Sequence, residues 1–168
     1  SYEKVLKDLF IIYDMPAWNL NLKSTVSVRA APTHHFIDTS IATRALGIKP
    51  SDLINDLHSF GFFFEDFAVR DLSIYADSIQ AKLKHYRDSA NREIDAIVEL
   101  KNGEYAAVEI KIYSERNIKE GFSSLNRFEK ALKEDGLKLP KFKMILTSHG
   151  PCYRKDRTYV VPITALKN

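Results

Sequence analysis

The protein has 168 residues, of which 45% are hydrophobic, 11% aromatic and 28% charged. This composition is typical of a compact globular chain and excludes disordered and fibrous proteins. Its one cysteine, Cys152, cannot form an intrachain disulfide, and no apolar run approaches the roughly 18 residues of a membrane span. We therefore expect a cytoplasmic protein without a membrane-spanning segment.

The net charge of +3 is distributed unevenly along the chain. Residues 1–110 carry 12 basic and 16 acidic side chains, a net charge of −4, whereas residues 111–168 carry 13 and 6, a net charge of +7. A basic C-terminal third suits a polyanionic partner such as DNA, although a solvated lysine-rich helix face gives the same count. The candidates for nucleic-acid binding are Lys119, Arg127 and Lys130.

The first 49 residues are expected to form a small module of their own. Apolar spacing predicts a helix over 2–9, short strands over 10–13, around Val26–Val28 and at Phe36-Ile37, and a helix over 40–46 that ends at Gly47. A helix beside a small sheet favours a winged-helix-like remnant or a linker module. We expect it to precede a separate domain over residues 50–168.

Residues 50–168 show stronger patterns. Ser51 suits the N-cap of one helix and Gly61 the start of a second that runs to about Ser78, unless the two form one kinked helix. Alternating or apolar runs predict strands over 82–87, 93–100, 105–113, 141–147 and 158–162, with a helix over 117–133 between the third and the fourth. This order of elements predicts an α/β domain.

Charged residues interrupt two neighbouring strands of this domain. Alternation puts Glu109 and Lys111 on one face of their strand, and Asp95 interrupts the strand before it. A two-residue turn at Asn102-Gly103 would direct Asp95 to the opposite face, whereas a three-residue loop over 102–104, with Gly103 left-handed, pairs Asp95 with Lys111. We expect that loop, or a bulge with the same effect, and hence one cluster of all three charged groups.

Glu65 is the fourth candidate, because it lies on the apolar seam of the helix predicted after Gly61. Burying an uncompensated charge costs several kcal/mol, so this carboxylate needs a metal ion or a lysine nearby. Carboxylates from Asp95, Glu109 and Glu65 are hard ligands that suit Mg²⁺ or Mn²⁺, and a bound ion would promote phosphodiester hydrolysis. In that reaction Lys111 positions the attacking water or offsets negative charge. An ordinary surface ion pair of Glu109 with Lys111 is the alternative for those two residues.

Three other features are expected to have structural roles or none. The five histidines lack the spacing of zinc ligands, and with a single cysteine a zinc site is not expected. Trp18 follows Pro16 closely, and we expect its ring to pack within the N-terminal module. The six glycines never form a P-loop, so nucleotide binding is not expected in this chain.

The helix with Glu65, the three strands that follow and the next helix together resemble the core of the PD-(D/E)XK, or restriction-endonuclease-like, superfamily. Asp95, Glu109 and Lys111 match its motif residue by residue, with Ile94 where the motif's name has proline. The chain also resembles the uncharacterised domain found C-terminal to the ATPase module of many prokaryotic AAA-type proteins. Loose but collinear matches carry that second resemblance, at 10–14, 33–38, 41–47, 61–72, 86–88 and 95–111.

The resemblance implies a restriction-endonuclease-like mixed sheet flanked by helices. It also implies Mg²⁺-dependent cleavage of DNA by a domain that is normally attached to an AAA-type ATPase. Asp95, Glu109 and Glu65 would then be metal ligands and Lys111 the catalytic lysine. The alternative is a catalytically inactive module of the same fold that binds nucleic acid or docks the ATPase. A third possibility is an oligomerisation domain that associates through the aromatic stretch Phe60–Phe67.

Overall fold

The computed structural model of the protein describes residues 1–19 and 31–167, so the strand predicted around Val26–Val28 lies outside the described residues. The helices are α1 (Tyr2–Asp8), α2 (Thr39–Ala45), α3 (Pro50–Asn55), α4 (Leu57–Ser78), α5 (Glu115–Glu134) and the 3₁₀ helix η1 (Ile163–Ala165). The strands are β1 (Ile12–Met15), β2 (Thr33–Phe36), β3 (Lys82–Arg87), β4 (Glu93–Glu99), β5 (Tyr105–Lys111), β6 (Phe142–Thr147), β7 (Tyr153–Lys155) and β8 (Thr158–Pro162). None of the described helices is both long enough and apolar enough to cross a bilayer.

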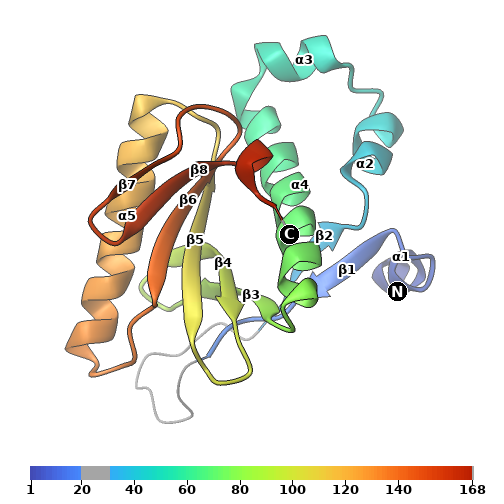
Figure 1. Ribbon diagram of the computed structural model, residues 1–168. Coiled ribbons are helices and arrows are strands. Elements are labelled where there is room, and N and C mark those ends of the chain that lie inside the picture. Colours follow the sequence, from blue (N-terminus) through green and yellow to red (C-terminus); the bar gives the residue numbers. More distant parts are fainter. Residues whose placement is uncertain (20–30, 168) are drawn as a thin grey trace.

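Six strands form a mixed sheet in the order β3-β4-β5-β6-β8-β7 (Figure 1). Strands β3, β4 and β5 are antiparallel neighbours, β5, β6 and β8 are parallel, and β7 runs antiparallel to β8. The parallel pair β5–β6 needs a crossover connection, and α5 supplies it. The predicted α/β class, with a mixed sheet flanked by helices, is confirmed.

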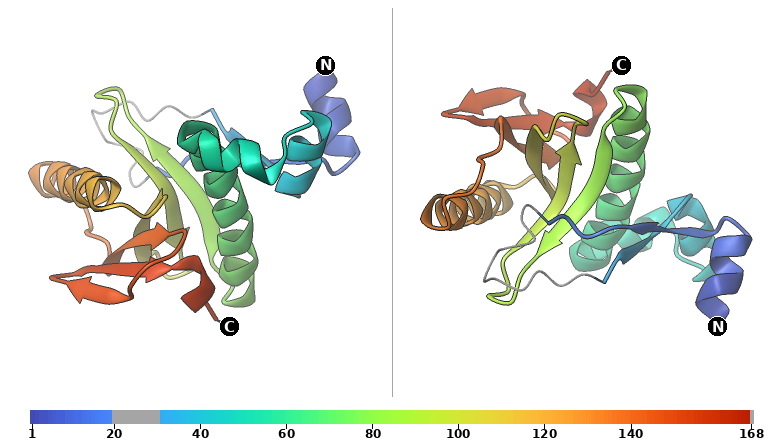
Figure 2. Two further views of the ribbon diagram at one scale, coloured as in Figure 1. Left: turned by 90° about the horizontal axis from the view of Figure 1, so that it is seen from above. Right: turned by 90° about the horizontal axis from the view of Figure 1, so that it is seen from below.

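Helices α4 and α5 cover opposite faces of this sheet (Figure 2). Apolar residues at helical spacing on each helix meet one face of the strands, so β5 is buried from Tyr105 to Ile110. The α4 side of the core contains Phe64, Ala68, Val69, Leu72, Ala96, Val108, Ile110, Met144 and Leu146. The α5 side contains Ile97, Tyr105, Ala107, Ile118, Leu125, Phe128, Leu132, Ile145 and Val160.

The N-terminal segment carries a separate two-stranded antiparallel sheet, β1–β2, with α1, α2 and α3. Its relationship to winged-helix modules stays a prediction. The prediction for Trp18 was wrong, because the indole is 1% exposed in the core beneath α5, against Tyr86, Tyr105 and Phe128. Its Nε1 donates to Glu99 Oε1 at 3.0 Å, which satisfies the polar atom of the buried ring.

The sequence pattern predicted that a helix begins at Gly61, but this glycine lies inside α4. The helix begins at Leu57 because the Asp56 carboxylate accepts from the backbone N–H groups of His58 and Ser59. A glycine inside a helix costs about 1 kcal/mol relative to alanine, a cost that the packing of a long buried helix face offsets. The helix carrying Glu65 is therefore longer than predicted.

Candidate metal and nucleic-acid site

The β4–β5 hairpin sets the relative positions of three predicted site residues. Its register pairs Ala96 with Val108, and extending it by one residue sets Asp95 opposite Glu109. The hairpin closes through a three-residue loop over 101–103, in which Gly103 has φ +72°. The predicted loop size and the left-handed glycine are confirmed, but the loop begins one residue earlier than predicted.

The position of this loop follows from the side chain of Asn102, whose Oδ1 accepts from Glu104 N at 2.9 Å. The backbone carbonyl of Glu104 then continues the strand ladder by accepting a hydrogen bond from Leu100 N at 2.8 Å. The change moves the partner of Asp95 from Lys111 to Glu109, a shift of two residues. Because side chains alternate with a period of two, the shift leaves both residues on the face shared with Asp95.

The ammonium group of Lys111 lies between the two carboxylates. Its Nζ is 2.9 Å from Asp95 Oδ2 and 2.7 Å from Glu109 Oε2. The same Asp95 oxygen accepts from Ile110 N at 2.7 Å, and Ser124 Oγ of α5 donates to Glu109 Oε1 at 2.8 Å. The structure therefore brings together the three residues that the hairpin argument predicted, and α5 adds Ser124.

Burial and a neighbouring negative charge weaken the acidity of the Glu109 carboxyl group. Burial, followed by the charge of Asp95, raises the pKa of Glu109 to about 7. Burial opposes the charge of Lys111, but the carboxylates of Asp95 and Glu109 outweigh it and raise the pKa of the ammonium above its usual value. One ammonium group thus pairs with two carboxylates, and a further cation nearby would favour the ionised form of Glu109.

Glu65 approaches the same cluster from α4. Burial, and then the charge of Asp95, raises the pKa of Glu65 to about 7. No hydrogen bond or ion pair joins the side chain of Glu65 to any other part of the chain that the structure describes. It lines a pocket of about 350 Å³ together with Asp95. Glu65 is therefore a partly buried carboxylate that is electrostatically coupled to the cluster and open to a ligand.

A second pocket, of about 490 Å³, opens on the α5 side of Asp95. Its lining comprises Ala90, Asn91, Arg92, Glu93, Asp95, Glu109, Lys111, Ser124 and Arg127. We call it the basic pocket, since Arg92, Lys111 and Arg127 contribute three cations to it. Of the predicted nucleic-acid-binding residues, only Arg127 lies there. Lys119 and Lys130 are exposed on α5 outside this lining, and Lys130 pairs with Glu134 at 3.7 Å.

Arg92 is held in the basic pocket by a residue that sequence reasoning did not select. Asp88 is 0% exposed, and its Oδ2 accepts from Arg92 Nε at 2.6 Å and from Tyr86 Oη at 2.8 Å. Its Oδ1 accepts from the backbone N–H groups of Ala90 and Arg92 at 2.8 and 3.0 Å. Burial alone would raise the pKa of Asp88, but these bonds lower it, so the carboxylate stays charged and orients the guanidinium.

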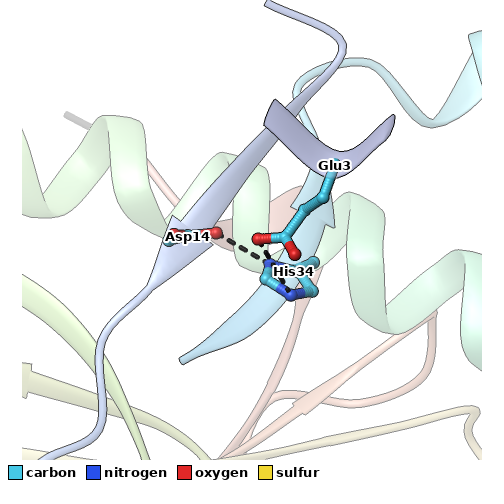
Figure 3. Close-up of side chains that lie close together, drawn as sticks. All are labelled: Glu3, Asp14 and His34. Carbon is cyan, nitrogen blue, oxygen red and sulfur yellow. Dashed lines mark hydrogen bonds and ion pairs between the residues drawn. The ribbon is translucent and has the colours of Figure 1, made fainter. Parts of the chain in front are cut away.

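A different group of possible metal ligands lies on the N-terminal segment (Figure 3). The ligand atoms of Glu3, Asp14 and His34 all lie within 4.8 Å of one another, and no other such trio occurs in residues 1–19 and 31–167. Lys7 Nζ already neutralises Glu3 and Asp14, at 2.5 and 2.6 Å. The three residues come from α1, β1 and β2, so the spacing of these residues along the chain does not indicate the cluster.

Comparison with protein families matches residues 60–166 to the family described as "Domain of unknown function (DUF4143)". The matched range includes Glu65, Asp95, Glu109 and Lys111. No curated protein and no solved structure matches the chain significantly. Because the match covers more than half of the chain, the protein belongs to the DUF4143 family, and the predicted resemblance to an uncharacterised domain is confirmed to that extent.

Proposed function

We propose that this DUF4143 protein is a nuclease domain of the restriction-endonuclease-like type that hydrolyses DNA phosphodiester bonds with Mg²⁺ or Mn²⁺. One observation carries the proposal: Lys111 bridges Asp95 and Glu109 on adjacent strands, at the wall of a pocket with two arginines. The order α4, β3, β4, β5, α5 supports it, since it agrees with the order of elements in the superfamily that the sequence resembles.

Asp95, Glu109 and Glu65 offer the oxygen ligands that a hard divalent cation prefers. Their ligand atoms do not all lie within 4.8 Å of one another, so an ion would have to draw the three side chains together. Asp95, Glu109 and Glu65 would hold it, because carboxylate oxygens are preferred by Mg²⁺ and Mn²⁺ and because Glu65 has no competing partner among the described residues. When bound, the ion would polarise the phosphoryl group and lower the pKa of a nearby water. Lys111 must release at least one carboxylate for this, since the same oxygens serve the ammonium and the ion.

The other residues of the site have roles that follow from their contacts. Ser124 fixes the orientation of Glu109 through its 2.8 Å hydrogen bond. Lys111, once released from a carboxylate, would position the attacking water or offset the charge that develops on the phosphoryl oxygens. Arg92 and Arg127 would hold the DNA phosphates, because guanidinium groups bind phosphate oxygens in a fixed fork geometry.

The proposal extends to the setting of the reaction. The sequence resemblance supports attachment to an AAA-type ATPase domain, whose P-loop this sequence does not contain. A cytoplasmic location, expected from the composition, belongs to the same proposal. The division into an N-terminal module over 1–49 and a nuclease-like domain over 50–168 belongs to the same proposal, with Trp18 of the first segment completing the core of the second.

The second candidate is an inactive module of the same fold that binds nucleic acid or docks the ATPase. The observation that favours it is also the ion pairing of Lys111, which satisfies both carboxylates without a metal ion. The two candidates differ in one measurable property. Only the nuclease needs the carboxylates to exchange Lys111 for a divalent ion.

Nicking of supercoiled plasmid with Mg²⁺ or Mn²⁺ tests the choice. We expect Asp95→Ala and Lys111→Ala to abolish nicking, while the exposed control variants Asp77→Ala and Lys4→Ala cleave like the wild type. Circular dichroism and thermal unfolding check that all four variants are folded. Metal-dependent cleavage that persists in both site variants contradicts the assignment, and the absence of cleavage and of metal binding in the wild type favours the inactive module.

A further inference from the structure

The pocket that contains Glu65 is lined by aromatic side chains from two parts of the chain. Its lining residues come from the β1–β2 sheet, from α4 and from β3 and β4 of the main sheet, elements that are labelled in Figure 1. Phe36 of β2 and Phe62 and Phe63 of α4 contribute rings, beside the apolar side chains of Met15 and Ile94. Phe62 is 64% exposed, so much of its ring is open to solvent, and the ring makes an edge-to-face contact with His58. We call this the aromatic pocket.

Most polar groups of the aromatic pocket are already engaged. Asp66 accepts from Phe36 N at 3.0 Å and from Thr39 Oγ1 at 2.9 Å, and its Oδ1 lies 3.1 Å from His35 Nδ1. Arg87 pairs with Glu93 at 2.7 Å. Glu65 is the exception, since its carboxylate has no hydrogen-bond or ion-pair partner among the described residues. A ligand in this pocket therefore finds aromatic faces and one open hydrogen-bonding group.

The aromatic pocket adjoins the basic pocket through two shared residues, Glu93 and Asp95, which line both. The two pockets differ in charge. The basic pocket has three cations against the three carboxylates of Glu93, Asp95 and Glu109, whereas the aromatic pocket has four carboxylates, at Glu65, Asp66, Glu93 and Asp95, against the single guanidinium of Arg87. Phosphate groups favour the first environment, and a flat, uncharged group with N–H donors favours the second.

We propose that the aromatic pocket binds one unpaired nucleobase of the DNA strand whose phosphate occupies the basic pocket. The proposal rests on the proposed function, since it places DNA at this site. Phe62 supplies a stacking surface, and in the absence of a metal ion Glu65 supplies an acceptor for an exocyclic amino group, as acidic side chains do for cytosine N4. A volume of about 350 Å³ lies near the lower end of small-ligand pockets, so it suits a base and not a duplex.

This arrangement defines the class of DNA that the site takes. A base inside a duplex is paired and stacked, and it reaches a side pocket only after extrusion, which costs a few kcal/mol. A base in a single strand, a flap or a bubble avoids that cost. The preferred substrate is therefore single-stranded or locally unpaired DNA, held by its phosphates on the α5 side and by a base on the α4 side.

Binding measured in EDTA separates this inference from cleavage. The probes are an oligonucleotide containing one 2-aminopurine, used single-stranded, and the same strand in a fully paired duplex. We expect the wild type to bind the single strand more tightly and to change the 2-aminopurine fluorescence. Phe62→Ala should weaken that binding roughly five- to hundredfold, the range of one base–aromatic stack. Ile74→Ala is the matched control, because Ile74 is an exposed residue of α4 (58%) outside the pocket.

The remaining outcomes distinguish the two proposals. Equal affinity for duplex and single strand, or a fluorescence response that Phe62→Ala retains, overturns the base pocket and leaves the nuclease assignment intact. Base binding that depends on Phe62, found together with no metal-dependent nicking, supports the pocket and overturns the proposed cleavage. A wild-type protein that binds neither DNA probe overturns both.

Discussion

Lys111 Nζ lies 2.7 Å from Glu109 Oε2, and the two side chains are separated by a single residue on one face of β5. Glu109 is 3% exposed, so its charge has little access to bulk water. The nearby Asp95 adds a second carboxylate to the same ammonium group. In the metal-free protein, Lys111 thus supplies the positive charge that a divalent ion would otherwise supply, and the predictions about metal binding follow from this competition.

Removing the ammonium group of Lys111 should strengthen the binding of a metal ion. We expect Lys111→Met to bind Mn²⁺ at least several-fold more tightly than the wild type, because both carboxylates lose their competing cation, while nicking is lost. Isothermal titration at pH 8 measures the affinity. Lys119→Met, which removes an exposed lysine of α5 outside the basic pocket, is the control and should leave the affinity unchanged. Weaker Mn²⁺ binding by Lys111→Met would show that the two cations do not compete.

Metal binding should depend on pH near neutrality. Glu65 and Glu109 each have a pKa raised to about 7, and a carboxyl must lose its proton to ligate a metal. We expect the Mn²⁺ affinity to rise as the pH increases from 6 to 7, by up to about tenfold for each proton displaced, and to level off above pH 8. Titrations at four pH values in one buffer test this. An affinity that is flat from pH 6 to pH 8 contradicts it.

The stability of the metal-free protein should fall as the pH rises, whereas the metal affinity should increase. The pKa of Glu65 is higher in the folded protein than in the unfolded chain, so protonation of Glu65 adds to the free energy of unfolding. This contribution is complete below the ordinary carboxyl pKa of 4.5 and is lost as the pH rises through about 7. Glu65→Gln removes this loss. We expect urea unfolding to show a stability gain at pH 8 that disappears near pH 4.5, with Glu134→Gln, an exposed control, unchanged. A gain of equal size at both pH values would mean that ionisation is not its cause.

Arg92 should contribute to DNA binding through phosphate contact. We expect Arg92→Gln to weaken binding of DNA of any sequence to a similar degree and to reduce the magnitude of the salt slope by about 1. Fluorescence anisotropy at several salt concentrations measures both quantities. Arg116→Gln is the control, since Arg116 is an exposed arginine on α5 that pairs with Glu120 outside the basic pocket. An unchanged salt slope for Arg92→Gln would show that this guanidinium does not meet a phosphate.

Substituting alanine for either of two helical glycines should change the stability of the protein in opposite directions. At Gly61 of α4 a Cβ would meet no atom within 4 Å, so Gly61→Ala should stabilise the protein by up to about 1 kcal/mol. At Gly121 of α5 a Cβ would lie 3.1 Å from Ile145 Cδ1 in the buried core, so Gly121→Ala should destabilise it by about 1–3 kcal/mol. Chemical denaturation of both variants tests the pair. Equal changes would contradict the packing of α5 on β6.

The sequence predicted those features that depend on local periodicity. Strand β3 and strand β8 have their predicted bounds, and the face shared by Asp95, Glu109 and Lys111 followed from alternation and loop size. The exact loop position did not, because it depends on a hydrogen bond of the Asn102 side chain. The start of α4 was missed for a similar reason, since the Asp56 cap outweighs the signal of Gly61.

Features built from distant segments could not be predicted from spacing. Asp88 belongs to a segment that carries part of the family resemblance and lies only four residues from Arg92, but only the fold shows that it is completely buried. The aromatic pocket joins Phe36 to α4 across a tertiary contact between two segments. A method that reads one segment at a time detects the members of such sites but not their association.

The position of Trp18 has a consequence for how the protein can be divided. The family match begins at residue 60, but the hydrophobic core beneath α5 includes an indole from residue 18. A fragment that starts at residue 50 would leave a cavity of indole size between Tyr86, Tyr105 and Phe128, and it would strip Glu99 of a hydrogen-bond donor. The smallest autonomously folding unit is thus expected to be longer than the unit that sequence comparison delimits.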